Sequence, residues 1–227
     1  MLRLEDTSVT RGDFRLTADI AIPKGVTAII GPSGGGKSTL LDLIAGFITP
    51  ERGRIIFNDR DITDDPPGKR PVAMLFQDNN LFPHLTALQN VVLGIDTSRK
   101  PSQQSLNRAK EALARVDLQG FESRRPADLS GGQQSRVALA RVILSDRAVI
   151  CLDEPFAALG PALRRDMLDL TATHLSDRTV LIVTHDPRDA RRIAANTVVV
   201  ADGKAAPPVP TDALLDNPPE ALRSYLG

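Results

Sequence analysis

Short runs of five or six apolar residues, rich in Val, Ile and Leu, recur along the chain between polar and turn-forming segments. Runs of this length without alternation are typical of parallel strands that are buried on both faces. Four such runs are residues 26–30, 72–76, 148–152 and 179–184, and a fifth is residues 197–201. The pattern therefore predicts an α/β fold with a mixed, mostly parallel sheet.

The N-terminal segment has a different pattern, in which apolar and polar residues alternate over residues 2–22. Alternation of this kind predicts half-buried antiparallel strands, and Arg11-Gly12-Asp13 supplies a turn between them. Residues 54–57, followed by Asn58-Asp59, predict a second short hairpin. We expect an antiparallel N-terminal β-subdomain beside the parallel strands.

The strand signal disappears between residues 83 and 136 and is replaced by helical periodicity, as at Ala109, Ala112, Leu113 and Val116. We expect a small helical subdomain inserted between the strands. The predicted organisation is a single domain, with a core at 1–82 and 137–210, a helical subdomain at 83–136 and a C-terminal tail at 211–227.

Composition limits the possible functions only broadly. The 227 residues include 28 Lys and Arg against 28 Asp and Glu, so no bulk charge draws the chain to nucleic acid or an anionic membrane. The single Cys151 excludes an intramolecular disulfide. No stretch of 18 apolar residues is present, and the first residues do not resemble a signal peptide. We expect a soluble, cytoplasmic chain that does not bind nucleic acid.

Residues 31–39 match the phosphate-loop pattern G-x-x-x-x-G-K-[ST] without a mismatch. They lie between a predicted strand and a predicted helix, as the mechanism of that loop requires. Glycine N–H groups and the helix N-terminus bind phosphate oxygens, Lys37 adds a positive charge, and Ser38 can ligate Mg²⁺. An ordinary Gly-rich turn explains this match poorly. The sequence predicts a phosphate-loop NTPase core, which GTPases, kinases, motors and transport ATPases all share.

Polar side chains follow three other predicted strands at the point where each ends. They are Gln77, the pair Asp153 and Glu154, and His185. Ligands collect at the carboxyl ends of parallel strands, so we expect these groups to lie together. An Asp there can hold Mg²⁺, Glu154 can orient a water, and Gln77 can ligate Mg²⁺ or hold a water. Alone, Gln77 or His185 would be an ordinary strand-end residue, and their convergence is what favours a site.

The segment Leu129-Ser130-Gly131-Gly132-Gln133 precedes a predicted helix that continues through Leu144. Ser130 is a good N-cap, and this is one explanation of the segment. The other explanation is a second anion site, made by the Ser130 hydroxyl and the glycine N–H groups at a positive helix end.

Taken in order, the phosphate loop, Gln77, the 129–133 segment, Asp153-Glu154 and His185 resemble the ATPase subunit of ATP-binding-cassette (ABC) transporters over nearly the whole chain. The resemblance implies ATP and Mg²⁺ as cofactors and a head-to-tail dimer of two copies. It further implies the following roles. The phosphate-binding residues are Gly31, Pro32, Ser33, Gly34, Gly35, Gly36, Lys37, Ser38 and Thr39.

In that family Ser38, Gln77 and Asp153 surround Mg²⁺. Glu154 acts on the attacking water, and His185 contacts the γ-phosphate. The 129–133 segment, called the signature segment below, acts on the nucleotide of the other subunit. The residues with that role are Ser130, Gly131, Gly132 and Gln133.

Two positions depart from the family pattern. The family has an Asp where this chain has Gly160, directly before a predicted helix. The family also stacks an aromatic residue, often Tyr, on adenine, but the only tyrosine here is Tyr225. Phe14 and Arg11 are the candidates for that contact, and the alternation around Phe14 equally favours a core role.

Within the family, residues 65–71, 74–82 and 198–203 resemble the ATPase subunit of bacterial thiamine importers. This resemblance implies an integral membrane permease as partner, a periplasmic solute-binding protein as an indirect one, and a peripheral position on the cytoplasmic face of the inner membrane. The alternatives are an importer of polyamine, ferric iron or molybdate, or a soluble non-transport ABC ATPase. A kinase or GTPase would not explain the signature segment.

Overall fold

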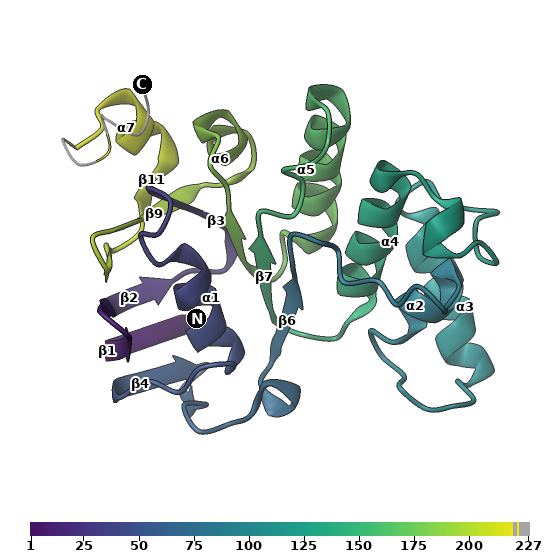
Figure 1. Ribbon diagram of the computed structural model, residues 1–227, viewed down its shortest axis with the longest axis horizontal. Helices are drawn as coiled ribbons and strands as arrows, with labels where there is room; N and C mark the ends of the chain where they lie inside the picture. Colours follow the sequence, from purple (N-terminus) through teal and green to yellow (C-terminus); the bar gives the residue numbers. More distant parts are fainter. Residues whose placement is uncertain (220–221, 223–227) are drawn as a thin grey trace.

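The computed structural model describes residues 1–219 and residue 222 (Figure 1). Of the expected C-terminal tail, residues 220–221 and 223–227, which include Tyr225, lie outside the described residues. The strands are β1 Leu2–Arg11, β2 Phe14–Ile22, β3 Gly25–Ile30, β4 Arg52–Phe57, β5 Arg60–Asp61, β6 Val72–Leu75, β7 Val149–Asp153, β8 Thr179–Val183, β9 Asn196–Ala201, β10 Lys204–Ala205 and β11 Val209–Pro210. The helices are α1 Lys37–Ala45, α2 Ala87–Val92, α3 Gln103–Ala114, α4 Gly131–Leu144, α5 Pro161–Leu175, α6 Pro187–Ile193 and α7 Thr211–Asp216, with short 3₁₀ turns at Pro67–Lys69 and Pro126–Asp128.

In the described part of the chain, five parallel strands make up one end of the sheet, in the spatial order β9-β3-β8-β7-β6. Ile29 pairs with Val183, and Val183 pairs in turn with Asp153. Residues of β7 and β8 face both sides of the sheet and are buried on both, as the unbroken apolar runs predicted. The expected mostly parallel sheet is confirmed.

The N-terminal strands are antiparallel, also as predicted, with β1 pairing both β2 and β4. β10 joins them to the core, because it pairs in parallel with β2 and antiparallel with β9. One mixed sheet thus contains both parts of the fold.

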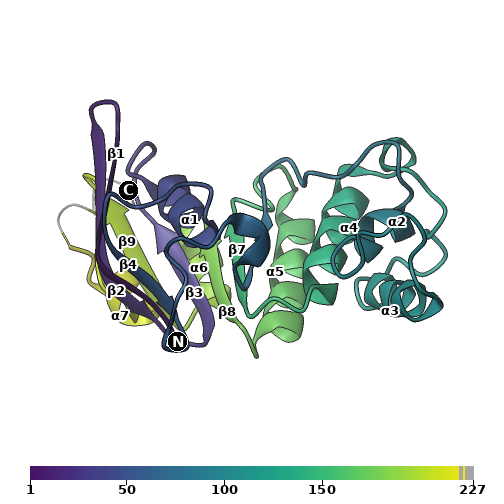
Figure 2. The same cartoon turned by 90° about the horizontal axis from the view of Figure 1, so that it is seen from below.

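Helix α1 lies between the antiparallel strands and the parallel strands (Figure 2). Its buried Leu40, Leu41 and Ile44 share one apolar core with Leu2 and Leu16 of the hairpin and with the facing side of β7 and β8. A second core lies on the other side of the parallel strands and contains residues from α2 to α7. The helix that follows the phosphate loop is therefore enclosed by protein on both sides.

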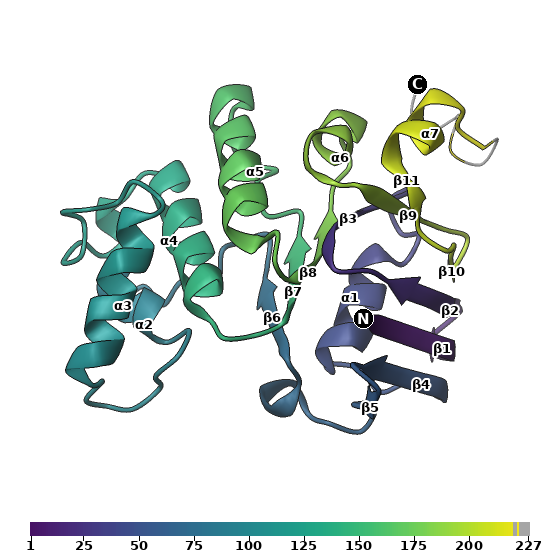
Figure 3. The ribbon, with the colours of Figure 1, turned by 180° about the vertical axis from the view of Figure 1, so that it is seen from behind.

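Helices α2, α3 and α4 form the helical lobe, at the opposite end of the molecule from α7 (Figures 1 and 3). The boundary expected between residues 136 and 137 falls inside α4, which runs without a break from Gly131 to Leu144. The helix continues because Val137, Ala140 and Val142 are buried in the same core as the rest of the lobe. A division at residue 136 passes through this continuous helix, whose extension to Leu144 the sequence predicted.

Arginines bind helix C-termini at the edge of the sheet opposite the expected site. Arg70 is 1% exposed, and its guanidinium donates to the carbonyls of Leu43 and Ile44 at the end of α1 (2.6 and 3.0 Å). It also donates to the carbonyls of Thr63 and Asp65. Burial lowers the pKa of Arg70, and nearby aspartates oppose that shift. A cation is favoured at this position because a helix C-terminus carries partial negative charge.

Arg178, the residue before β8, binds carbonyls at the C-terminus of α4 in the same way. Its guanidinium donates to the carbonyls of Ile143 (2.9 Å) and Ser145 (2.6 Å). Arg147, just before β7, donates to the Arg70 carbonyl (2.7 Å). The ends of α1 and α4 are thus tied to the starts of the strands that lead to the candidate site.

None of the helices in the described part of the chain is both long enough and apolar enough to cross a membrane.

We predict that Arg70→Met lowers the free energy of unfolding by about 3 kcal/mol, because buried carbonyls that lose their donors cost about 1–3 kcal/mol each. Urea unfolding of the whole chain, followed by circular dichroism, measures this. The control is Arg52→Met, since Arg52 only forms an exposed ion pair with Asp6 (2.6 Å) and such pairs contribute little. Equal losses in the two variants would contradict the role of Arg70.

Candidate nucleotide-binding site

The phosphate loop connects β3 to α1 with the geometry that its glycines allow. Gly31 and Gly36 have φ values of 148° and 106°, which side chains rarely tolerate. At Gly31 a Cβ atom would lie 2.0 Å from the Val200 carbonyl oxygen, so the loop approaches β9 too closely for any other residue. The predicted strand, loop and helix are all confirmed.

The N-terminus of α1 is suited to an anion. It has no side-chain cap, and no acidic residue lies in its first turn. Its first N–H groups therefore have no side-chain acceptor from the helix itself, and the helix dipole adds positive potential there. This is the arrangement expected of a phosphate site.

Lys37, the first residue of α1, is 8% exposed. Its ammonium donates to the carbonyls of Gly31 (2.8 Å) and Pro32 (2.9 Å). Burial lowers the pKa of Lys37, while the carboxylates of Glu154 and Asp153 oppose that shift. The loop thus folds around its own lysine and holds the positive charge near the ends of β3 and β7.

Oxygen ligands for a divalent cation lie next to this lysine. The Ser38 hydroxyl hydrogen-bonds the Asp153 carboxylate at the end of β7. Burial raises the pKa of Asp153, partly offset by that hydrogen bond and by Lys37. Asp153 and Gln77 line the same open hollow. Hydroxyl, carboxylate and amide oxygens fit Mg²⁺, which prefers oxygen ligands.

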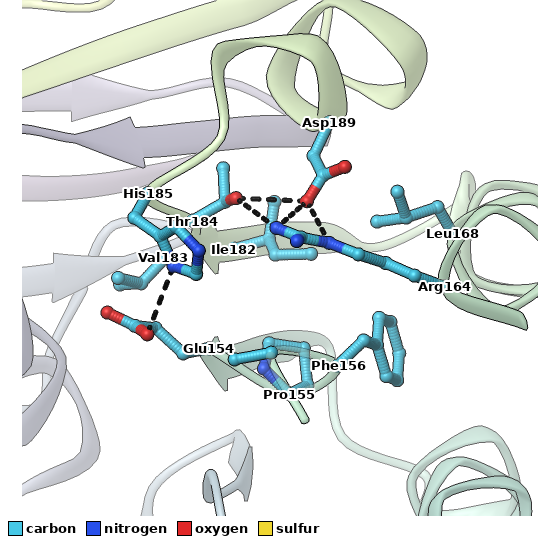
Figure 4. A pocket seen from close by; sticks show the side chains of 11 residues that line it. Glu154, Pro155, Phe156, Arg164, Leu168, Ile182, Val183, Thr184, His185 and Asp189 are labelled. Atoms are coloured by element: carbon cyan, nitrogen blue, oxygen red, sulfur yellow. Dashed lines mark hydrogen bonds and ion pairs between the residues drawn. The ribbon is translucent and has the colours of Figure 1, made fainter. Parts of the chain in front are cut away.

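Glu154 and His185 face one another beside this cation site (Figure 4). The distance from His185 Nδ1 to Glu154 Oε2 is 3.4 Å, and the two side chains are 51% and 28% exposed. Glu154 has a φ of 45°, which is uncommon for a residue with a side chain and costs of order 1 kcal/mol. Strain at a single acid on a strand end is typical of a functional position.

A partly buried network holds the end of β8, from which His185 extends (Figure 4). Asp189 of α6 accepts from the Thr184 hydroxyl (3.1 Å) and from Arg164 Nε of α5 (2.6 Å). Thr184 directly precedes His185, so two helices fix the direction in which the strand ends. Arg164 and Asp189 carry no sequence signal for this role, because they are 25 residues apart and belong to no local motif.

Ser130 is the N-cap of α4, which confirms the first of the two explanations of the signature segment. Its hydroxyl accepts from the Gln133 N–H (3.3 Å), and the Gln133 side chain accepts from the Ser130 N–H (2.9 Å). A Cβ at Gly132 would lie 2.2 Å from Leu163, so this glycine allows α4 and α5 to pack closely. At Gly131 a Cβ would meet nothing within 4 Å.

The structure brings the strand-end groups together but leaves the signature segment apart from them. Within residues 1–219, no hydrogen bond or ion pair links Ser130–Gln133 to the phosphate loop of the same chain. The N-cap engages Ser130 and Gln133 locally, while the exposed Ser130 and the open face of Gly131 leave this helix end accessible from outside the chain.

The remaining candidates lie at the margins of the site. Phe14 is half-buried and packs against the core that contains α1, and a Cβ at Gly36 would lie 2.8 Å from its ring. Arg11 is exposed and lies 4.0 Å from Asp42. Gly160 caps α5 without a side-chain hydrogen bond, as expected from Pro161 at the next position.

Comparisons with known proteins agree with this geometry. The ABC transporter family profile matches residues 18–157. The thiamine import ATP-binding protein ThiQ of Ruegeria sp. (strain TM1040) is 57% identical, over 100% of both chains. ThiQ of Cereibacter sphaeroides is 53% identical, also over 100% of both chains.

Two solved structures are similar in fold and sequence. A dimeric, post-hydrolysis structure of the ATP-binding cassette MJ0796 bound to ADP and Pi has a TM-score of 0.77 at 27% identity and covers 93% of this chain and 99% of its own. The ADP conformation of MJ1267, an ATP-binding cassette of an ABC transporter, has a TM-score of 0.87 at 26% identity and covers 100% and 98%.

We predict that Lys37→Ala weakens nucleotide binding, because it removes the buried positive charge from the phosphate loop. Equilibrium binding of a fluorescent ATP analogue measures this, with an expected loss of roughly tenfold or more for a charge-assisted contact. Lys24→Ala, a lysine outside the loop, is the matched control. Unchanged affinity in Lys37→Ala would contradict the loop as the nucleotide site.

Proposed function

The chain belongs to the ABC transporter family, and from this premise we propose that it is the ATP-hydrolysing subunit of a thiamine importer. The observation that carries the ATPase activity is the convergence of Lys37, Asp153, Glu154 and His185 at one edge of the sheet, beside an uncapped helix N-terminus. The thiamine assignment rests on the full-length similarity to relatives named for thiamine import.

In this proposal the phosphates of ATP bind the backbone of residues 31–39. The N-terminus of α1 and Lys37 balance their negative charge. Mg²⁺, held by Ser38, Asp153 and Gln77, would supply further charge neutralisation when bound. The adenine base would lie against Arg11, which is near Asp42 of α1, or against Phe14, which lies beside Gly36 of the loop.

Glu154 is the group we assign to the attacking water. Its carboxylate extends from the end of β7, next to Asp153 and near Lys37. An acid in that position accepts a hydrogen bond from the water and orients it towards the γ-phosphate. His185, 3.4 Å from Glu154, is placed to contact the same phosphate. The ion pair of Arg164 with Asp189 keeps Thr184 and therefore His185 in place.

Two copies of the chain complete the site. The signature segment has no contact with its own phosphate loop among the described residues, and the face of Gly131 is open. We propose that this helix end closes over the γ-phosphate bound by the other copy, so that Ser130, Gly131, Gly132 and Gln133 act in trans. The dimeric relative with bound ADP supports this arrangement. Hydrolysis then depends on closure of the dimer.

The permease would dock beside Gln77. Phe47 and Phe82 are 53% and 44% exposed, and the Phe47 ring lies 6.0 Å from that of Phe76, which lines the hollow with Gln77. Exposed aromatic residues are typical of protein interfaces. The chain would lie on the cytoplasmic face of the inner membrane, while a periplasmic binding protein and the permease select the cargo. No nucleic acid partner is part of this proposal.

We predict that Glu154→Gln lowers the rate of ATP hydrolysis by roughly 100-fold, the scale expected for loss of a positioned base. Nucleotide binding should persist, because the phosphate loop is unchanged, and an ATP-bound dimer should accumulate on gel filtration. The test combines phosphate release with size exclusion in ATP. Hydrolysis at the wild-type rate would refute the role of Glu154.

We predict that deleting the gene for this chain abolishes uptake of thiamine at low concentration in a host that cannot synthesise thiamine. Uptake of labelled thiamine measures this, and the Glu154→Gln variant should fail to restore it while the wild-type chain succeeds. Unchanged uptake in the deletion strain would exclude thiamine, and polyamine, ferric iron and molybdate import would be tested next.

A further inference from the structure

The three residues after Gln77 form a strained turn. Asn79 and Asn80 have φ values of 60° and 45°, so two consecutive residues with side chains adopt the left-handed conformation. Asn tolerates this region better than most residues, but it still prefers others. The turn therefore needs outside contacts to hold it.

Helix α4 supplies those contacts through Arg141. Its guanidinium donates to the Asn79 carbonyl through Nη2 and to the Asn80 carbonyl through Nη1, each at 2.9 Å. Burial lowers the pKa of Arg141, and no ion pair within residues 1–219 involves it. A planar guanidinium presents separate donors to the two carbonyls in a fixed fork, a geometry that an ammonium does not reproduce.

A second contact joins the same turn to the same helix. Asn79 Nδ2 donates to the Ser135 hydroxyl (3.2 Å), which in turn donates to the Gly131 carbonyl in the signature segment (3.1 Å). Asn79 Oδ1 is buried without a hydrogen-bond partner in the described part of the chain. The turn is thus bound to α4 at some energetic cost, which favours a positioning role over a purely stabilising one.

We propose that Arg141 is a positioning residue that couples Gln77 to the signature helix. Because it binds the two carbonyls of the strained turn, any movement of α4 carries the turn, and with it Gln77 and the hollow beside Asp153. This inference rests on the proposed function, since the property that Arg141 would control is the rate of ATP hydrolysis.

The experiment compares variants of the whole chain, assembled with its permease. Arg141→Lys keeps the charge but loses the planar fork whose Nη1 and Nη2 bind the two carbonyls separately. Asn80→Val leaves Arg141 intact but breaks the turn, because a β-branched residue does not tolerate the left-handed region. Asn80→Gly keeps the turn without strain. Arg136→Lys is the matched control on the same helix, since Arg136 binds the Val116 carbonyl and Asp117.

For each variant kcat, KM, the Kd for nucleotide and Tm are measured. We expect Arg141→Lys and Asn80→Val to lower kcat by roughly tenfold to a hundredfold, as for a displaced positioning group, with the Kd within about twofold of wild type. Asn80→Gly and Arg136→Lys should keep wild-type kcat. The double variant Arg141→Lys/Asn80→Val should have a kcat no lower than that of either single variant. Both changes break the same contact between Arg141 and the turn.

The coupling role is overturned if Arg141→Lys hydrolyses ATP at the wild-type rate, or if the losses of the two variants add in full. It is also overturned if kcat falls only in proportion to a lower Tm and weaker nucleotide binding. If Arg141→Lys does not fold, the comparison of Asn80→Val with Asn80→Gly tests the coupling role by the same criteria. A wild-type complex without ATPase activity would refute the proposed function instead.

Discussion

The pairing of four parallel strands is the constraint on which the rest of this structure depends. Because β3, β8, β7 and β6 run side by side in the same direction, residues far apart in sequence emerge at one edge. Lys37, Gln77, Asp153, Glu154 and His185 owe their proximity to this pairing alone. Any shift in register would separate Gln77 and Asp153 from the phosphate loop.

Arginines fix the helices relative to these strands, and they do so mainly through backbone carbonyls. Arg70, Arg147 and Arg178 bind carbonyls at the edge of the sheet away from the site, including those at the ends of α1 and α4. A guanidinium suits this task because it is planar, always charged and able to bind several acceptors at once. The partial negative charge of a helix C-terminus compensates the buried cation, and for Arg70 nearby aspartates add to this effect.

The carboxyl ends and the amino ends of the parallel strands therefore have different roles. One edge carries the exposed, strained and charged groups that a phosphate substrate needs, as the φ of Glu154 and the turn at Asn79 and Asn80 illustrate. The other edge is dense with hydrogen bonds that hold α1 and α4. The signature helix thus has one end anchored to the strands and its other end open, and Arg141 lies between the two and contacts the segment after Gln77.

The sequence alone predicted the elements and most of the site residues, because their signals are local. The phosphate loop is one continuous motif, and each strand-end group directly follows an apolar run. The Ser130 cap, the Pro161 helix start and the two hairpins also depend only on neighbouring residues. The family assignment followed from the order of these motifs, and the family match bears it out.

Only the tertiary structure decided what depends on contacts between distant segments. Arg70 meets the end of α1 across 27 residues, Arg164 meets Asp189 across 25, and Arg141 meets Asn79 across 62. An arginine is expected to be exposed, so no local pattern marks these side chains as buried donors. The burial of α4 beyond residue 136 was also decided by the tertiary structure, since it depends on packing against helices elsewhere in the chain.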